Sequence, residues 1–245
     1  MGDGTQAAQE SSDIVILNNS LTSIEKAVLY GRTMTESVKK FIIFQLTVNV
    51  TTIALALIGP MVGYSEPFTI IQILWINLIM DTLAALAFGE EPTLDRYMKR
   101  PPIGRKEHIL TGYMKSAIGT AGAFITIGST MLLANVFNVQ QHFDLHNTAE
   151  VLTFMFTFFI YAIIFNSLNT RSHGFNVFEY IGRNKKFIYV MTSIAVVQSL
   201  IIQSGGHVFS TVPMDMKHFG LALGLAFLII PIDMIRKAIT SSYKN

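Results

Sequence analysis

The chain has no cysteine and little charge. None of its 245 residues is Cys, only one is Trp, and charged residues make up 14%. The absence of Cys excludes disulfides, thiolate metal ligands and cysteine nucleophiles. A charged fraction far below the globular average of about 25%, together with 51% hydrophobic residues, indicates an integral membrane protein rather than a soluble enzyme. The net charge of +2 gives no indication of a nucleic-acid partner.

Six apolar segments approach the length of about 20 residues that a helix needs to cross a lipid bilayer. They cover residues 41–62, 69–88, 113–136, 151–168, 187–203 and 219–235. Lys and Arg gather before the first segment and after the second, fourth and sixth, whereas the loops 63–68 and 137–150 contain neither. The positive-inside rule therefore places both termini in the cytoplasm. The sequence predicts an all-α membrane protein with a six-transmembrane-helix bundle in residues 41–245.

The first 40 residues are more polar and are expected to lie in the cytoplasm. Ile14–Leu17 is too short for a signal peptide, and its β-branched residues are typical of a buried strand, although no partner strand is encoded nearby. Helical periodicity follows, with a possible break at Gly31. From Thr33 to Phe41 a helix is expected to continue directly into the first span. These residues suggest the tail of a larger cytoplasmic domain.

One carboxylate stands out within the second apolar segment. Asp81 has no Lys or Arg near it in sequence, and a charge in lipid costs at least about 2.5–3.5 kcal/mol on insertion scales. Asn77 lies four residues earlier, which places both side chains on one face of an α-helix. Asn49, in the first span, is expected to reach toward them. Amide and carboxylate oxygens are the ligands that calcium prefers, so Asn77, Asp81 and Asn49 form a candidate calcium site.

Other interpretations of these polar residues are open. Asp81 is equally compatible with a structural hydrogen bond or a proton relay, and Asn77 or Asn49 with helix–helix hydrogen bonds. Asp233 near the end of the sixth span has Arg236 and Lys237 one turn later, which favours a local ion pair over a second ion site.

Several motifs, in order along nearly the whole chain, resemble P-type calcium-transporting ATPases of the plasma-membrane (type IIB) branch. The most specific, similar to the sixth transmembrane helix of that family, is Trp75-Ile76-Asn77-Leu78-Ile79-Met80-Asp81-Thr82-Leu83-Ala84. Others are Phe44-Gln45-Leu46-Thr47-Val48-Asn49-Val50 of the fifth helix, Lys99-Arg100-Pro101-Pro102-Ile103-Gly104-Arg105 of a cytoplasmic loop, Asn176-Val177-Phe178-Glu179 and Gln203-Ser204-Gly205-Gly206. Residues 1–40 then resemble the end of the phosphorylation domain and its stalk helix.

The resemblance implies that Asn77 and Asp81 bind the transported calcium ion. Thr52 stands where the two-site reticulum pumps carry a carboxylate, and Met80 where they carry a ligating Thr. A second calcium site is therefore expected to be absent, as in the plasma-membrane branch. The organelle is left open between the plasma membrane, an intracellular calcium store and the vacuole membrane.

The family's phosphorylated Asp-Lys-Thr-Gly-Thr motif does not occur in these 245 residues. The resemblance assigns ATP and magnesium to the complete pump only, so the chain is expected to be a carboxy-terminal fragment that cannot pump alone and needs the missing amino-terminal pump domains. One alternative is a non-catalytic helical bundle that associates with or regulates a full-length pump. Another is a proton-coupled carrier that uses Asp81, although no inverted repeat supports it.

Overall fold

The computed structural model describes residues 4–18, 20–99, 101–102, 104, 108–172 and 174–242, without the side chains of residues 241 and 242. Within these ranges the chain is helical and contains no β-strand. Six helical segments are long and apolar enough to cross a membrane, which confirms the predicted all-α bundle. They are Leu21–Met61, Ile70–Gly89, Gly112–Leu133, Thr148–Arg171, Lys185–Ser204 and Met216–Thr240.

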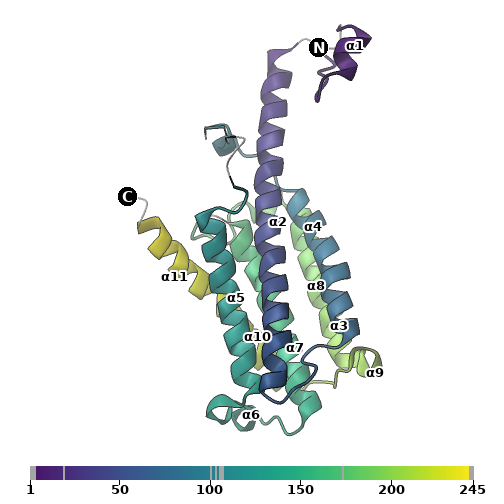
Figure 1. Ribbon diagram of the computed structural model, residues 1–245, viewed down its shortest axis with the longest axis vertical. Helices are drawn as coiled ribbons and strands as arrows, with labels where there is room; N and C mark the ends of the chain where they lie inside the picture. The colour runs from purple at the N-terminus through teal and green to yellow at the C-terminus, as the bar shows by residue number, and fades with distance from the viewer. Residues whose placement is uncertain are drawn as a thin grey trace.

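The first of these helices, α2 (Leu21–Met61), is 41 residues long and extends far beyond the bundle (Figure 1). It passes Gly31 without a break, so the predicted interruption there is wrong, while the predicted continuation of a helix from Thr33 into the first apolar span is confirmed. Gly31 lowers helix propensity by only about 1 kcal/mol, and the flanking helix formers outweigh it.

Before α2 lies the short helix α1 (Gln6–Glu10). The strand predicted at Ile14–Leu17 is wrong: this run is irregular, and Ile14 and Leu17 are exposed. The apolar run has no second strand to pair with, and a single strand cannot satisfy its own backbone hydrogen bonds.

The fourth spanning helix, α7 (Thr148–Arg171), is the centre of the bundle. It is apolar on all sides. In its most apolar stretch of 18 residues, 83% of the residues are buried, against 28–39% in the corresponding stretches of the other five spanning helices. Around it pack α2, α5 (Gly112–Leu133), α8 (Lys185–Ser204) and α10 (Met216–Phe227). A helix that is hydrophobic all round is typical of such an enclosed position.

The second span consists of three consecutive pieces. It begins as α3 (Ile70–Leu74), continues as the π-helix η1 (Trp75–Met80) and ends as α4 (Asp81–Gly89). A Thr69–Gln72 capping box fixes its start. The π-helical segment contains Asn77 and ends immediately before Asp81, so the candidate calcium residues lie at the irregular part of this span.

The sixth span is bent between α10 and α11 (Ile229–Ser242), and Figure 1 shows α11 leaving the bundle at an angle. Pro231 lies at the third position of α11 and has no N–H to donate to the preceding turn. The short helical turns in the connections are η2 (Asp95–Tyr97), η3 (Val136–Asn138), α6 (Val139–His142), η4 (Ile181–Arg183) and α9 (Gly206–Phe209).

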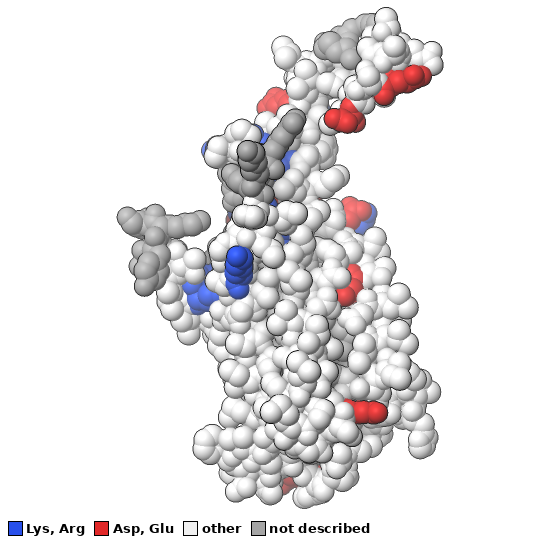
Figure 2. All heavy atoms as spheres, viewed as in Figure 1, with Lys and Arg blue, Asp and Glu red and all other residues white. Residues whose placement is uncertain are grey.

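Both ends of the described chain lie toward the same end of the bundle, here called the terminal end, while α6 and α9 lie at the opposite, loop end (Figure 1). On the face that Figure 2 shows, Lys and Arg lie toward the terminal end and the lower part is free of both. This asymmetry agrees with the sequence pattern from which the orientation was predicted.

Candidate functional site

Asp81 is a buried carboxylate in the middle of a spanning segment. Only 7% of the residue is exposed, and its Oδ1 is enclosed without a hydrogen-bond donor among the described residues. Among the described residues, none of the ion pairs includes Asp81. A carboxylate oxygen placed in this way is costly unless a cation or proton compensates its charge.

The two amides predicted to accompany Asp81 lie in different surroundings. Asn77 is exposed, on a stripe of the second span that also presents Leu74 and Leu78. Asn49 is half-buried beside the exposed Val50. In the described structure no hydrogen bond joins Asn49, Asn77 and Asp81 to one another. A spacing of four residues places two side chains on one face only in a regular α-helix, whereas a π-helical turn contains an extra residue and changes which neighbours share a face.

The two positions that depart from the two-site reticulum pumps are not arranged as ion ligands. The Thr52 hydroxyl donates to the carbonyl oxygen of Val48, one turn earlier, at 2.9 Å. Met80 is 1% exposed and belongs to the apolar core. Among the described residues, no group of three or more His, Asp and Glu side chains is close enough together to hold a metal ion.

Three charged residues meet at the terminal end of the bundle, and the sequence did not point to them as a unit. Lys40 of α2 donates from Nζ to Oε2 of Glu91 at 2.5 Å, and Nε of Arg171 lies 4.0 Å from the other Glu91 oxygen. All three side chains are almost fully buried, with exposures of 1%, 6% and 3%. In the sequence, Lys40 and Arg171 served only to orient the spans. The feature that could have indicated this cluster is the position of Glu91, an acid directly after a span and close to basic loops.

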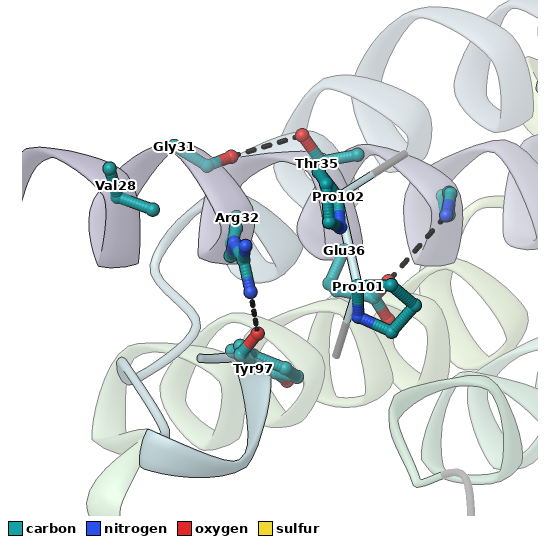
Figure 3. Close-up of a pocket in the computed structure, with 9 residues that line it drawn as sticks. Val28, Gly31, Arg32, Thr35, Glu36, Tyr97, Pro101 and Pro102 are labelled. Carbon is teal, nitrogen blue, oxygen red and sulfur yellow. Dashed lines mark hydrogen bonds and ion pairs between the residues drawn. The ribbon is translucent and has the colours of Figure 1, made fainter. Parts of the chain in front are cut away.

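A second contact joins α2 to the segment that follows α4. Nη1 of Arg32 donates to the carbonyl oxygens of Tyr97 at 2.8 Å and Met98 at 3.1 Å, and Figure 3 shows the side chain reaching from α2 to this segment. A cavity of about 410 Å³ lies beside it, bordered by Thr35 and Pro101. Burial raises the pKa of the Tyr97 phenol above its ordinary value, so it stays neutral at physiological pH.

Asp233 forms the local ion pairs that its spacing predicted. Its Oδ1 lies 2.6 Å from Nε of Arg236 and its Oδ2 lies 3.2 Å from Nζ of Lys237. The Lys237 ammonium also donates to the carbonyl oxygens of Asn169 and Ser172 at the end of α7. These contacts fasten α11 to α7, which confirms the structural interpretation of Asp233.

Comparison with known proteins agrees with this architecture. Residues 65–239 match the family described as "Cation transporting ATPase, C-terminus". The chain is 33% identical over 242 residues to calcium-transporting ATPase 8, plasma membrane-type, of Arabidopsis thaliana, covering 96% of this chain and 22% of that protein. It is 36% identical over 236 residues to plasma membrane calcium-transporting ATPase 2 of Oreochromis mossambicus, covering 92% of this chain and 21% of the relative.

A third relative, calcium-transporting ATPase 2 of Schizosaccharomyces pombe, is 33% identical over 244 residues, which are 98% of this chain and 19% of the relative. The chain thus spans about a fifth of the length of the curated relatives it matches. The matched family and the six spanning helices lead to one assignment: the chain belongs to the cation-transporting ATPase C-terminal family and corresponds to the carboxy-terminal membrane part of plasma-membrane-type P-type calcium ATPases.

Proposed function

We propose that this chain forms part of the calcium pathway of an ATP-driven P-type pump, with the Asp81 carboxylate as its charged ligand. The observation that carries the proposal is the enclosed Oδ1 of Asp81, which has no hydrogen-bond donor among the described residues. It lies directly after a π-helical segment, and such distortions occur frequently at functional sites. A calcium ion that visits the site compensates this buried charge.

Asn77 and Asn49 are the proposed amide ligands. A carboxylate and two amides offer at most about four oxygens, whereas calcium takes six to eight. The remaining ligands therefore come from elsewhere in the complete pump. Asn77 lies on an exposed stripe of the span, so its amide is open to helices of the complete pump that are not part of this chain.

Thr52 and Met80 support a single calcium ion per cycle. The Thr52 hydroxyl is already committed to a backbone carbonyl, and Met80 offers only a thioether, which a hard cation such as calcium does not favour. Residues 1–40 are proposed to belong to the phosphorylation domain and stalk, on the cytoplasmic side together with the other terminus. ATP and magnesium act in the parts of the pump that carry the phosphorylated Asp.

Asp81→Asn tests the ligand assignment in a complete pump that carries this segment. We expect loss of calcium-dependent phosphorylation from ATP, because the amide keeps the shape of the side chain and removes its charge. Thr82→Ala, one residue along on the exposed side of α4, is the matched control and is expected to leave phosphorylation intact. Normal phosphoenzyme formation in Asp81→Asn would contradict the proposal.

The chain by itself is proposed not to pump. Vesicles that contain only this chain should show no ATP-driven calcium uptake, and uptake above that of empty vesicles would refute this point. The uncovered stripe around Asn77 also fits a second function, association with a separate full-length pump. Co-purification of this chain with a tagged complete pump distinguishes that case, since a covalent segment has no need to bind one.

A further inference from the structure

The ion-pair cluster of Lys40, Glu91 and Arg171, here called the Glu91 cluster, joins three spans at the terminal end of the bundle. Lys40 lies on α2, Arg171 is the last residue of α7, and Glu91 follows α4 by two residues. Glu91 receives the Lys40 ammonium on one oxygen and faces Arg171 on the other. The Arg171 guanidinium also donates to the carbonyl oxygen of Glu179, so it is held independently of Glu91.

An aromatic layer of three rings, one each from α2, α4 and α8, lies next to the Glu91 cluster. The ring centroid of Phe88 in α4 is 5.6 Å from that of Phe44 in α2 and 5.6 Å from that of Phe187 in α8. The guanidinium carbon of Arg171 lies 5.5 Å from the Phe187 ring centroid. This layer provides apolar contact beside the Glu91 cluster, whereas the Lys40–Glu91 pair supplies the directional contact between α2 and the end of the second span.

The Lys40–Glu91 contact joins α2 to the end of the second span and gives a reference point for comparing positions on the two helices. The two helices run in opposite directions (Figure 1), and Asn49 lies nine residues along α2 from Lys40, while Asp81 lies ten residues back from Glu91. At about 1.5 Å per helical residue, Asn49 lies about 13.5 Å from Lys40. By the same rise, Asp81 lies about 12 Å from Gly89, the last residue of α4, which Glu91 follows by two residues. Counted from this contact, Asn49 and Asp81 therefore lie at similar depths in the bundle.

We propose that Lys40, through its buried pair with Glu91, is a positioning residue that sets the register between α2 and the second span and thereby aligns Asn49 with Asp81 for calcium. Lys40 does not touch the ion. The proposal rests on the proposed function for its consequence, while the register itself is a property of this chain. Buried polar pairs are best attested as devices that select one register over others that apolar packing would allow.

The absence of Cys allows a direct measurement of the register in the full chain. We place spin labels at Leu57→Cys on α2 and Leu86→Cys on α4, two exposed positions separated by about 18 Å along the helix axes. Pulsed electron paramagnetic resonance in lipid nanodiscs then gives the distance between them. Because the labels are far apart along the helix axis, sliding one helix along the other changes the distance between the labels by almost the length of the slide.

Lys40→Met is expected to shift the mean distance by at least one residue rise, about 1.5 Å, or to broaden its distribution. Lys39→Met is the matched control, because Lys39 pairs with Glu36 within α2 and is expected to leave the distance unchanged. If Lys40→Met fails to fold, the double variant Lys40→Met with Glu91→Gln removes the ion pair and keeps an amide oxygen facing Arg171, which the Glu179 carbonyl also holds. A distribution identical to that of the unmodified chain in whichever variant folds would overturn the proposal.

The consequence for calcium is measured in a complete pump that carries this segment. Lys40→Met is expected to raise the calcium concentration for half-maximal phosphorylation by about two- to thirtyfold, the range for residues that act on a distant site through packing. Lys39→Met should leave it unchanged. If Asp81→Asn phosphorylates normally, the proposed function fails, yet the label distance still decides the role of Lys40. An unchanged calcium requirement in Lys40→Met, with Asp81→Asn inactive, would overturn the alignment of the site.

Discussion

The indole N–H of Trp75 donates to the side-chain oxygen of Gln198 at 2.9 Å, and both residues are buried. This bond ties the first residue of the π-helical segment to α8. A Trp with a satisfied N–H contributes a large apolar surface together with a fixed orientation. The irregular segment before Asp81 is therefore anchored at its start by a specific contact.

We expect Trp75→Phe to lower the free energy of unfolding by about 1–3 kcal/mol, because the Gln198 oxygen then stays buried without a donor. Adding Gln198→Leu should recover part of this loss, since the unpaired amide is removed as well. Thermal unfolding followed by circular dichroism in detergent gives the comparison. If Trp75→Phe and the double variant Trp75→Phe with Gln198→Leu are equally stable, the Gln198 oxygen has no measurable cost without its donor, and the prediction is contradicted.

Two glycines of α2 are predicted to respond in opposite directions to the same substitution. A Cβ at Gly59 would lie 2.7 Å from Cγ of Pro67 and 3.0 Å from the carbonyl oxygen of Tyr64, neither of which moves easily. Gly59→Ala should destabilise the chain by about 1–3 kcal/mol. At Gly31 no atom lies within 4 Å of the added carbon, so Gly31→Ala should stabilise α2 by about 0.5–1 kcal/mol. Melting temperatures that move the same way in both variants would contradict this prediction.

Phe88 is fully buried between two other rings, and its truncation tests the aromatic layer beside the Glu91 cluster. Phe88→Ala should cost about 3–5 kcal/mol through lost apolar contact and the cavity left behind. Leu86→Ala in the same helix is exposed and should change stability by no more than about 0.5 kcal/mol. Unfolding in a denaturing detergent series measures both, and similar losses in the two variants would argue against the packing described.

The loop end contains an ion pair whose titration is predictable. Oδ2 of Asp144 accepts a hydrogen bond from the Lys217 ammonium at 2.6 Å, and this contact holds the pKa of Asp144 below its ordinary value. The contribution of the pair to stability is therefore present above the ordinary pKa of Asp, about 3.9, and is lost as the pH falls through the lower folded value.

Carbon NMR of the Asp144 carboxyl during a pH titration checks this prediction. Lys217→Ala should return the pKa of Asp144 toward its ordinary value. High salt should act in the same direction, because exposed charges are screened. A titration curve that neither change moves would mean that Lys217 does not hold the carboxylate.

Sequence reasoning located the spanning helices because a bilayer imposes a simple rule on the chain. A helix that crosses lipid must satisfy its own backbone hydrogen bonds and present apolar residues for about 20 positions. That pattern depends only on residues close together in the chain, so the six spans could be predicted without knowing which helices pack against one another. The wrong predictions, a strand at Ile14–Leu17 and a helix break at Gly31, also rested on local features. In both places the only basis was a weak residue preference for strand or against helix.

The candidate site was only partly readable from the sequence. Asp81 could be identified because an acid in an apolar run is rare and costly, and the structure encloses it. Whether Asn77 and Asp81 lie on the same face of the span could not be predicted, because the π-helical turn changes the spacing of side chains around the span. The predicted role of Asn49, Asn77 and Asp81 in calcium binding remains a prediction.

By itself the sequence determined that this protein has six segments long and apolar enough to cross a membrane, which residues are charged within them, and which family it resembles. Each of these follows from residue type and short-range spacing. Only the tertiary structure decided that α7 is the central helix and that Lys40, Glu91 and Arg171 meet. The reason is physical: helices in a bundle contact one another through residues far apart in the chain, and no periodicity along one helix specifies which neighbour it will face.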